Sequence, residues 1–223
     1  MDQPLSLSQN IYVLGIHPKK GGIIPASYTA MDYVLIGSLF LELYLNKNIL
    51  FEDKRIKILN PKSGNSLHRF LLEKMNRSKR PLKISRWINK LYFSMSFIKK
   101  EVQNQLVDKR VIRMEPKRFL IFKWHKPVLV KTQVVYSLIK EIESYIFGGP
   151  SAAEEIMLLS LLKPAGLLKR VFPEKERLKR AKRNLKRLMV ENQVSSAVAD
   201  AISASNAVAA SLAATSAAAS AAT

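Results

Sequence analysis

The hydrophobic pattern of this chain is strongest between Met31 and Leu45, where nearly every side of a helical wheel is apolar. A helix can be apolar all round only when neighbours surround it, so we expect this segment at the centre of the fold. Amphipathic spacing predicts further helices around it, with Ser6 or Ser8 as the N-cap of the first and Ser151 at N-cap spacing before another. These helices are expected at Ser6–Ile16, Asn65–Asn76, Ile84–Leu106, Lys131–Phe147, Glu154–Leu162 and Pro173–Val190.

Two segments have the pattern of β-strands. Alternation of isoleucines with basic residues predicts one short strand within Ile49–Leu59. Two β-prone runs, Val111–Met114 and Phe119–Trp124, flank the segment Glu115–Arg118, which contains a proline, and this order predicts a hairpin with its turn at those four residues. An exposed apolar tip is expected at Phe119, Ile121 and Phe122.

These elements predict a mainly α protein that forms one helical domain over residues 1–223. The chain of 223 residues, 48% of them hydrophobic, is long enough to bury one substantial core. Residues 201–223 are dominated by Ala and Ser, a composition that favours helix but offers few bulky side chains, so we expect weak packing there. The most apolar run, Tyr33–Leu45, is shorter than the roughly 20 residues of a membrane-spanning helix and contains Glu42, so it predicts a buried helix.

The charge narrows the classes of partner. The 37 Lys and Arg against 17 Asp and Glu give a net charge of +20, which attracts polyanions such as nucleic acids or anionic lipid headgroups. Charge alone does not choose between them. The N-terminus lacks the layout of a secretory signal and the chain has no cysteine, which is compatible with a reducing compartment, so we expect a cytoplasmic location.

Catalytic and cofactor motifs are missing from the sequence. The three histidines, His17, His68 and His125, are far apart, and the glycine pairs lack the context of phosphate-binding loops. Without cysteine or a Gly-x-Ser-x-Gly elbow, nucleophilic catalysis has no recognisable residue. We therefore expect no enzyme, no metal site and no cofactor.

Two basic clusters remain as candidate binding surfaces. Between Lys163 and Arg187, eleven basic residues and two glutamates surround an apolar stripe of helical period. Such a helix lies either at a membrane interface or on an ordinary protein surface with its stripe packed inward. The second cluster places basic residues beside the aromatic residues of the hairpin, as at a membrane interface or in a nucleic-acid-binding protein. Its basic members are Lys99, Lys100, Lys109, Arg110, Arg113, Lys117, Arg118 and Lys123.

The order of several segments resembles the Golgi phosphoprotein 3 family. Leu35–Leu45 is similar to that family's Leu-x-Gly-x-x-Leu-x-Glu-Leu-x-Leu helix, and Gln105–Ile112 to the helix end that leads into its hairpin. Other segments also occur in the family's order along the chain: Leu5–Ile16, Gly21-Gly22, Phe119–Phe122, Ala181–Arg183 and the Ala-rich end. The resemblance implies a central helical bundle, surrounding amphipathic helices, a projecting β-hairpin used for membrane contact or self-association, and binding of phosphatidylinositol phosphate without catalysis. In eukaryotic members it also implies adaptor contacts.

The family's headgroup-binding residues transfer poorly. Its pocket tryptophan falls near Ser27 and its core-helix arginine at Ile36, while two further arginines fall at Ser96 and Lys99, so only Lys99 keeps the charge. A phosphate monoester needs several convergent donors, because each charge-assisted bond supplies only ~1.5–3 kcal/mol before desolvation. We therefore expect either diffuse attraction to anionic membrane or a site rebuilt from neighbours on the same face. The rebuilt site would use Lys100 and Arg86.

The leading hypothesis is a peripheral membrane protein that binds phosphatidylinositol 4-phosphate or a related anionic lipid. It would dock through a basic face and a membrane-contacting hairpin that includes Arg118, Phe119, Phe122 and Trp124. Client membrane proteins and a homo-oligomer formed through the hairpin are possible partners, and a Golgi location would apply only to a eukaryotic source. The alternatives are a nucleic-acid-binding helical protein that uses Arg177–Arg187, and a self-associating scaffold.

Overall fold

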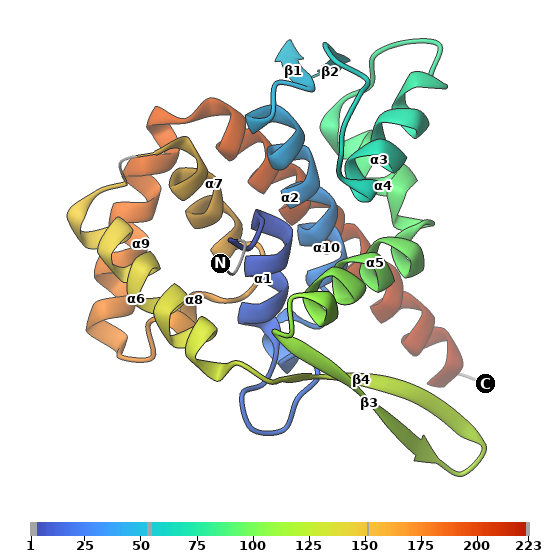
Figure 1. Cartoon of the computed structure of the whole chain (residues 1–223), viewed down its shortest axis with the longest axis vertical. Coiled ribbons are helices and arrows are strands. Elements are labelled where there is room, and N and C mark those ends of the chain that lie inside the picture. Colours follow the sequence, from blue (N-terminus) through green and yellow to red (C-terminus); the bar gives the residue numbers. More distant parts are fainter. Residues whose placement is uncertain (1–3, 53–54, 151, 222–223) are drawn as a thin grey trace.

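A computed structural model describes residues 4–52, 55–150 and 152–221. Their secondary structure is helical apart from two antiparallel two-stranded sheets, which confirms the expectation of a mainly α fold with a projecting hairpin (Figure 1). The helices are α1 (Leu7–Gly15), η1 (Pro25–Ser27), α2 (Met31–Leu45), α3 (Ser66–Asn76), α4 (Ile84–Tyr92), α5 (Met95–Asp108), α6 (Thr132–Gly148), α7 (Ala153–Leu162), α8 (Leu168–Val171), α9 (Lys175–Glu191) and α10 (Gln193–Ala221). The strands are β1 (Ile49–Glu52), β2 (Arg55–Ile58), β3 (Ile112–Phe119) and β4 (Phe122–Leu129).

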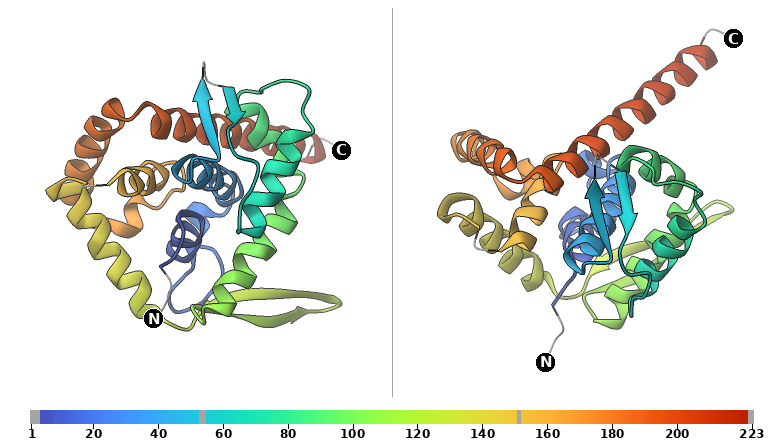
Figure 2. Two further views of the ribbon diagram at one scale, coloured as in Figure 1. Left: turned by 45° about the horizontal axis from the view of Figure 1, so that its top comes forward. Right: turned by 90° about the horizontal axis from the view of Figure 1, so that it is seen from above.

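Helix α2 is the centre of the molecule, as its hydrophobic pattern predicts. It packs against α1, α4, α5, α7 and α10, which surround it when the fold is viewed as in the left panel of Figure 2. Its side chains from Val34 to Leu43 are all buried. Gly37 allows α10 to approach closely, because a Cβ atom at this position would lie 2.3 Å from Cδ1 of Ile202.

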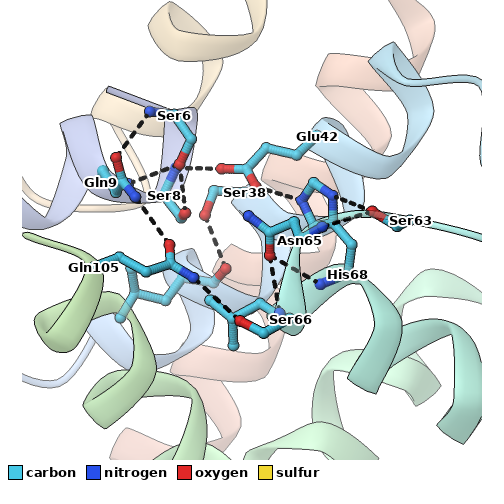
Figure 3. A network of polar contacts seen from close by, with 12 residues as sticks. Ser6, Ser8, Gln9, Ser38, Glu42, Ser63, Asn65, Ser66, His68 and Gln105 are labelled. Atoms are coloured by element: carbon cyan, nitrogen blue, oxygen red, sulfur yellow. Dashed lines mark hydrogen bonds and ion pairs between the residues drawn. The ribbon is translucent and has the colours of Figure 1, made fainter. Parts of the chain in front are cut away.

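A buried polar network ties α1, α2, α3 and α5 together (Figure 3). Nε2 of His68 lies 2.7 Å from Oε2 of Glu42, and the backbone amide of Ser8 donates to Oε1 of the same carboxylate at 2.7 Å. Nearby, Nε2 of Gln9 donates to Oε1 of Gln105 at 2.9 Å. Leaving one buried donor or acceptor without its partner typically costs about 1–3 kcal/mol, so this network favours one arrangement of the four helices.

The first helix begins where the sequence predicts. The hydroxyl of Ser6 accepts from the amide of Gln9, and the Gln9 side chain accepts from the Ser6 amide, which makes a capping box. The other proposed cap, Ser151, lies outside the described residues, and the N-cap of α7 is Ala152.

Two predicted elements are each divided in the structure. The helix expected over Ile84–Leu106 is broken at Phe93-Ser94 into α4 and α5. Its buried positions keep helical spacing across the break, from Leu91 to Met95 and Ile98, so the pattern alone could not reveal the corner. The single strand expected within Ile49–Leu59 folds back on itself as β1 and β2.

Helix α10 begins as part of the core. Val198 and Ile202 are fully buried, whereas the far end of the helix runs away from the rest of the fold (Figure 2, right). Weak packing of residues 201–223 stays a prediction, since residues 222–223 and the side chains from 208 onward lie outside what the structure describes.

Candidate functional site

The β3–β4 hairpin has its turn in a different place from the one predicted. The strands pair from Ile112↔Leu129 to Phe119↔Phe122, so the turn is Leu120-Ile121. Pro116 lies within β3, where its missing N–H is tolerated because each strand of a two-stranded ribbon has a free edge. The prediction of a turn at Glu115–Arg118 is therefore wrong, although the hairpin itself is confirmed.

The base of the hairpin is fixed to the core. Ile112 and Leu129 are buried, and the amide of Gly22 donates to the carbonyl of Pro127 at 2.7 Å. The amide of Val130 donates to the carbonyl of Val111 at 2.9 Å. Beyond this base the ribbon projects away from the helices (Figure 1), so its tip is held at a defined distance from the body.

The tip of the hairpin is apolar and exposed. The exposed fractions are 71% for Leu120, 82% for Ile121, 66% for Phe122 and 47% for Trp124. These values confirm the expected apolar tip for Ile121 and Phe122, while the Phe119 side chain lies outside the described part of the chain. Leu120 has a φ of 52°, a left-handed conformation that costs a residue other than glycine of order 1–3 kcal/mol. A large apolar residue thus occupies a turn position that glycine or asparagine would stabilise better.

Basic residues lie immediately behind this apolar tip. Arg118 and Lys123 are directly opposite in the strand register and both are exposed, although like charges in that position repel each other. Closer to the base of the hairpin, Glu115 forms ion pairs with Arg113 at 2.7 Å and with Lys117 at 3.2 Å. The hydrogen bond from Arg113, followed by that from Lys117, lowers the pKa of the Glu115 carboxyl. An anionic surface against the tip would relieve the repulsion between Arg118 and Lys123.

Four of the five predicted headgroup-binding residues lie on α4 and α5 but have different environments. Nζ of Lys99 forms an ion pair with Oδ1 of Asp32 at 2.7 Å, which connects α5 to α2. Arg86 on α4, and Ser96 and Lys100 on α5, are exposed. Part of the charge on Lys99 is therefore already compensated, and the remaining cations face solvent.

Ser27 does not belong to this surface. Its side chain is fully buried, and its hydroxyl donates to the carbonyl of Ala165 at 2.6 Å. Gly166 permits this close packing, since it has a φ of 69° and a Cβ atom there would lie 2.2 Å from the Ala26 carbonyl oxygen. Ile36, at the other transferred position, is also fully buried. Because its hydroxyl is buried and already bonded, Ser27 is no longer a candidate for headgroup binding, and that prediction is corrected.

The corner between α4 and α5 carries exposed aromatic residues that were not among the predicted site residues. Phe93 is 92% exposed and lies in sequence between Tyr92 and Phe97, which are also exposed. A signal was present in the sequence, because Tyr92 and Phe93 fall outside the apolar stripe of α4.

The basic helix α9 packs its apolar stripe inward. Ala181 and Leu185 are buried, and the side-chain amide of Asn184 donates to the carbonyl of Ile146 on α6 at 3.0 Å. Arg177 forms an ion pair with Glu143 at 3.1 Å. The sequence left open whether this helix lies at a membrane interface or on an ordinary protein surface, and its buried apolar stripe favours the ordinary surface helix.

One group of polar side chains has the order of a catalytic triad. Oγ of Ser63 lies 3.5 Å from Nδ1 of His68, whose other ring nitrogen contacts Glu42, so a hydroxyl, an imidazole and a carboxylate lie in sequence. However, His68 and Glu42 are buried, and the Ser63 hydroxyl accepts from the amide of Asn65. We interpret the group as a structural tie between α2 and α3. Among the described residues, no cluster of three or more histidine, aspartate or glutamate side chains could hold a metal ion.

Comparisons with known proteins complete the description of this chain. Within the part that the structure describes, no helix has the length and apolar character needed to cross a bilayer. A search of curated proteins gives no match. A model of the Golgi phosphoprotein 3 family matches residues 7–205, which include α1, the central helix α2, the hairpin and the buried part of α10. The chain therefore belongs to the Golgi phosphoprotein 3 family.

Proposed function

We propose that the protein binds anionic phospholipid bilayers as a peripheral membrane protein, through the tip of the β3–β4 hairpin and the cations behind it. The observation that carries this proposal is the exposed apolar tip at Leu120, Ile121 and Phe122. Arg118 and Lys123 form the next pair along the two strands, on the side of the tip nearer the base. Apolar side chains that enter the interfacial layer and basic groups that meet headgroups are the two contributions that hold proteins on anionic membranes.

Membership of the Golgi phosphoprotein 3 family supports a lipid-binding role in general. The lipid is phosphatidylinositol 4-phosphate or a related anionic phospholipid in our proposal. We favour recognition by diffuse charge over a fixed pocket, because Lys99 is already paired with Asp32, whereas Arg86 and Lys100 are exposed to solvent. Surface attraction of about 1 kcal/mol per basic residue needs no fixed geometry.

Binding of client membrane proteins and self-association through the hairpin would extend this role. A hairpin whose tip enters the bilayer leaves the helical body above the membrane, where an adaptor could hold a cytoplasmic segment of a client. The same apolar tip could alternatively pair with a second copy, so membrane binding and self-association through it would compete.

The test is co-sedimentation with vesicles of phosphatidylcholine alone, with added phosphatidylserine, and with added phosphatidylinositol 4-phosphate, each at low and high salt. We expect binding to both kinds of anionic vesicle, weak binding to neutral vesicles, and a large loss at high salt because exposed charges are screened. Selectivity for the phosphoinositide that survives high salt would instead indicate a rebuilt pocket.

A parallel binding assay with nucleic acid distinguishes the alternative functions. Absence of binding to every vesicle, together with salt-dependent retention on duplex DNA or RNA, would replace the membrane proposal with nucleic-acid binding. Absence of both, with an oligomer that dissociates when the hairpin is shortened, would support the scaffold instead.

A further inference from the structure

The corner between α4 and α5 presents an aromatic surface at a fixed position. Phe93 occupies the C-cap of α4 and is 92% exposed, the largest exposure among the large hydrophobic residues that the structure describes. Phe97 is 46% exposed and Tyr92 41%. We refer to Tyr92, Phe93 and Phe97 as the aromatic corner.

The aromatic corner is held by the core beneath it. The ring of Tyr92 stacks on that of Tyr33 from α2, with centroids 4.9 Å apart and planes inclined by 11°. The ring of Phe97 packs against Phe70 from α3 at 4.7 Å. The Ser94 amide donates to the Leu91 carbonyl at 2.8 Å, which closes the turn. Phe93 is therefore presented to solvent by a turn whose neighbours are already ordered.

The charge around the aromatic corner is positive. Arg86, Lys90 and Lys100 are exposed on the two helices that form it, and Nζ of Lys90 lies 5.1 Å from the centre of the Trp87 ring. The nearby carboxylates have partners within the protein. Asp32 pairs with Lys99, and Glu101 accepts a hydrogen bond from Ser66. Exposed aromatic rings beside exposed basic side chains match the chemistry of an anionic membrane interface.

We propose that the aromatic corner is a second membrane anchor, in which Phe93 enters the interfacial layer of an anionic bilayer while Arg86, Lys90 and Lys100 meet headgroups. This inference rests on the proposed function. The α4–α5 corner and the hairpin tip extend toward the same side of the molecule, the right-hand side of Figure 1. Two anchors separated along this side would fix the orientation of the helical body on the membrane, which one hairpin cannot do.

The first test uses tryptophan as a reporter of depth. Phe93→Trp is placed in a Trp124→Phe background. The only other tryptophan of this protein is then the buried Trp87, whose emission should be the same with and without vesicles. The matched control is Tyr136→Trp in the same background, because Tyr136 is also exposed, at 63%, but lies on α6. Vesicles of phosphatidylcholine and phosphatidylserine are prepared with and without brominated acyl chains.

We expect the emission of the Phe93→Trp protein to shift to the blue on these vesicles and to be quenched by the brominated chains, with neither effect for Tyr136→Trp. A Phe93→Ser variant should bind the same vesicles about tenfold more weakly, since it loses the burial of one aromatic side chain. Its fold should be unchanged because the Phe93 side chain is almost fully exposed.

Three results would overturn the inference, and they are distinguishable. Vesicle binding without quenching of Phe93→Trp would leave the hairpin as the anchor and remove the aromatic corner. A blue shift that grows with protein concentration in the absence of vesicles would assign the corner to contact with a second copy of the chain. Failure of the unsubstituted protein to bind any vesicle would reject the proposed function and this inference together.

Discussion

The hairpin and helix α9 are both rich in basic residues, yet they place their apolar side chains in opposite ways. In α9, Ala181 and Leu185 are buried, and the guanidinium groups of Arg177 and Arg180 lie 5.8 and 5.5 Å from the centre of the Phe147 ring. In the hairpin, Ile121 and Phe122 point into solvent. Positive charge is therefore a poor guide to a membrane contact, and the direction of the apolar side chains is a better one.

The two regions also lie far apart. Helix α9 is at the left of Figure 1, and the hairpin tip is at the right. If the tip contacts the bilayer, the charge of α9 acts from a distance, where it accelerates approach to an anionic surface more than it strengthens the final contact. Four predictions test this division between the two regions.

The largest expected effect is on folding. Leu185→Ala should lower the free energy of unfolding by about 2–5 kcal/mol because it leaves a cavity under α9. Ile121→Ala should change it by less than about 0.5 kcal/mol, since the hairpin side chain is exposed. Urea denaturation of both variants measures the difference. Equal losses would mean that the tip is packed in solution, against this comparison.

The next effect is on membrane binding. The double variant Ile121→Ser/Phe122→Ser should bind anionic vesicles at least ten times more weakly, because each side chain contributes up to about 1.5–3 kcal/mol when it leaves water. Val190→Ser is the matched control in α9, where Val190 is 77% exposed, and it should bind normally. Co-sedimentation provides the measurement, and a comparable loss in the control would show that α9 also touches the bilayer.

A smaller effect is expected from charge. Arg118→Gln/Lys123→Gln should weaken binding to anionic vesicles roughly 5- to 30-fold at low salt, from about 1 kcal/mol per basic residue near the surface. Lys179→Gln/Arg183→Gln removes the same charge from exposed positions of α9 and should cost less than about threefold. Binding isotherms at two salt concentrations compare the pairs. Losses of equal size would contradict the assignment of contact to the hairpin.

The smallest effect is a pH dependence of the hairpin. The pKa of Glu115 is lowered mainly by its hydrogen bond with Arg113, so the ionised carboxylate is favoured in the folded ribbon. Its contribution is complete above the ordinary glutamate range and is lost as pH falls through the lowered value. The protection factors of the hairpin amides, measured by NMR and thus corrected for the slower intrinsic exchange at low pH, should therefore fall at acid pH. Glu115→Gln should remove that dependence, while the protection factors in α9 stay unaffected. Persistence of the acid response in the variant would assign it to another group.

The sequence predicted those elements whose stability is governed by local patterns. The apolar run of α2 and the N-cap of α1, predicted at Ser6 or Ser8 and found at Ser6, each act within a few residues, and the structure reproduces both. The inward packing of α9 depended on whether α6 and α7 were available to cover it, so the amphipathic pattern left two readings open. Burial of Ser27 likewise depends on the distant residue Ala165.

The errors at the hairpin and at the α4–α5 corner have a common physical origin. Pro116 resembles a turn residue, but the actual turn contains Leu120 and Ile121, which turn statistics disfavour. At the corner, the tertiary core keeps the spacing of Leu91, Met95 and Ile98 through a break that leaves Phe93 exposed. In both places an apolar residue stands where local rules would select a polar residue or glycine, and the two places are those that we propose to meet the membrane.

The close crossing of α2 and α10 at Gly37 and Ile202 also constrains how the protein is made. The central helix is synthesised early, but the helix that covers this side of it emerges only after almost all of the core has been translated. Contacts between segments so distant in sequence form late and leave apolar surface exposed in the meantime. A nascent chain that stops short of Val198 and Ile202 would display the uncovered side of α2, so chaperones should engage the growing polypeptide until these two side chains leave the ribosome.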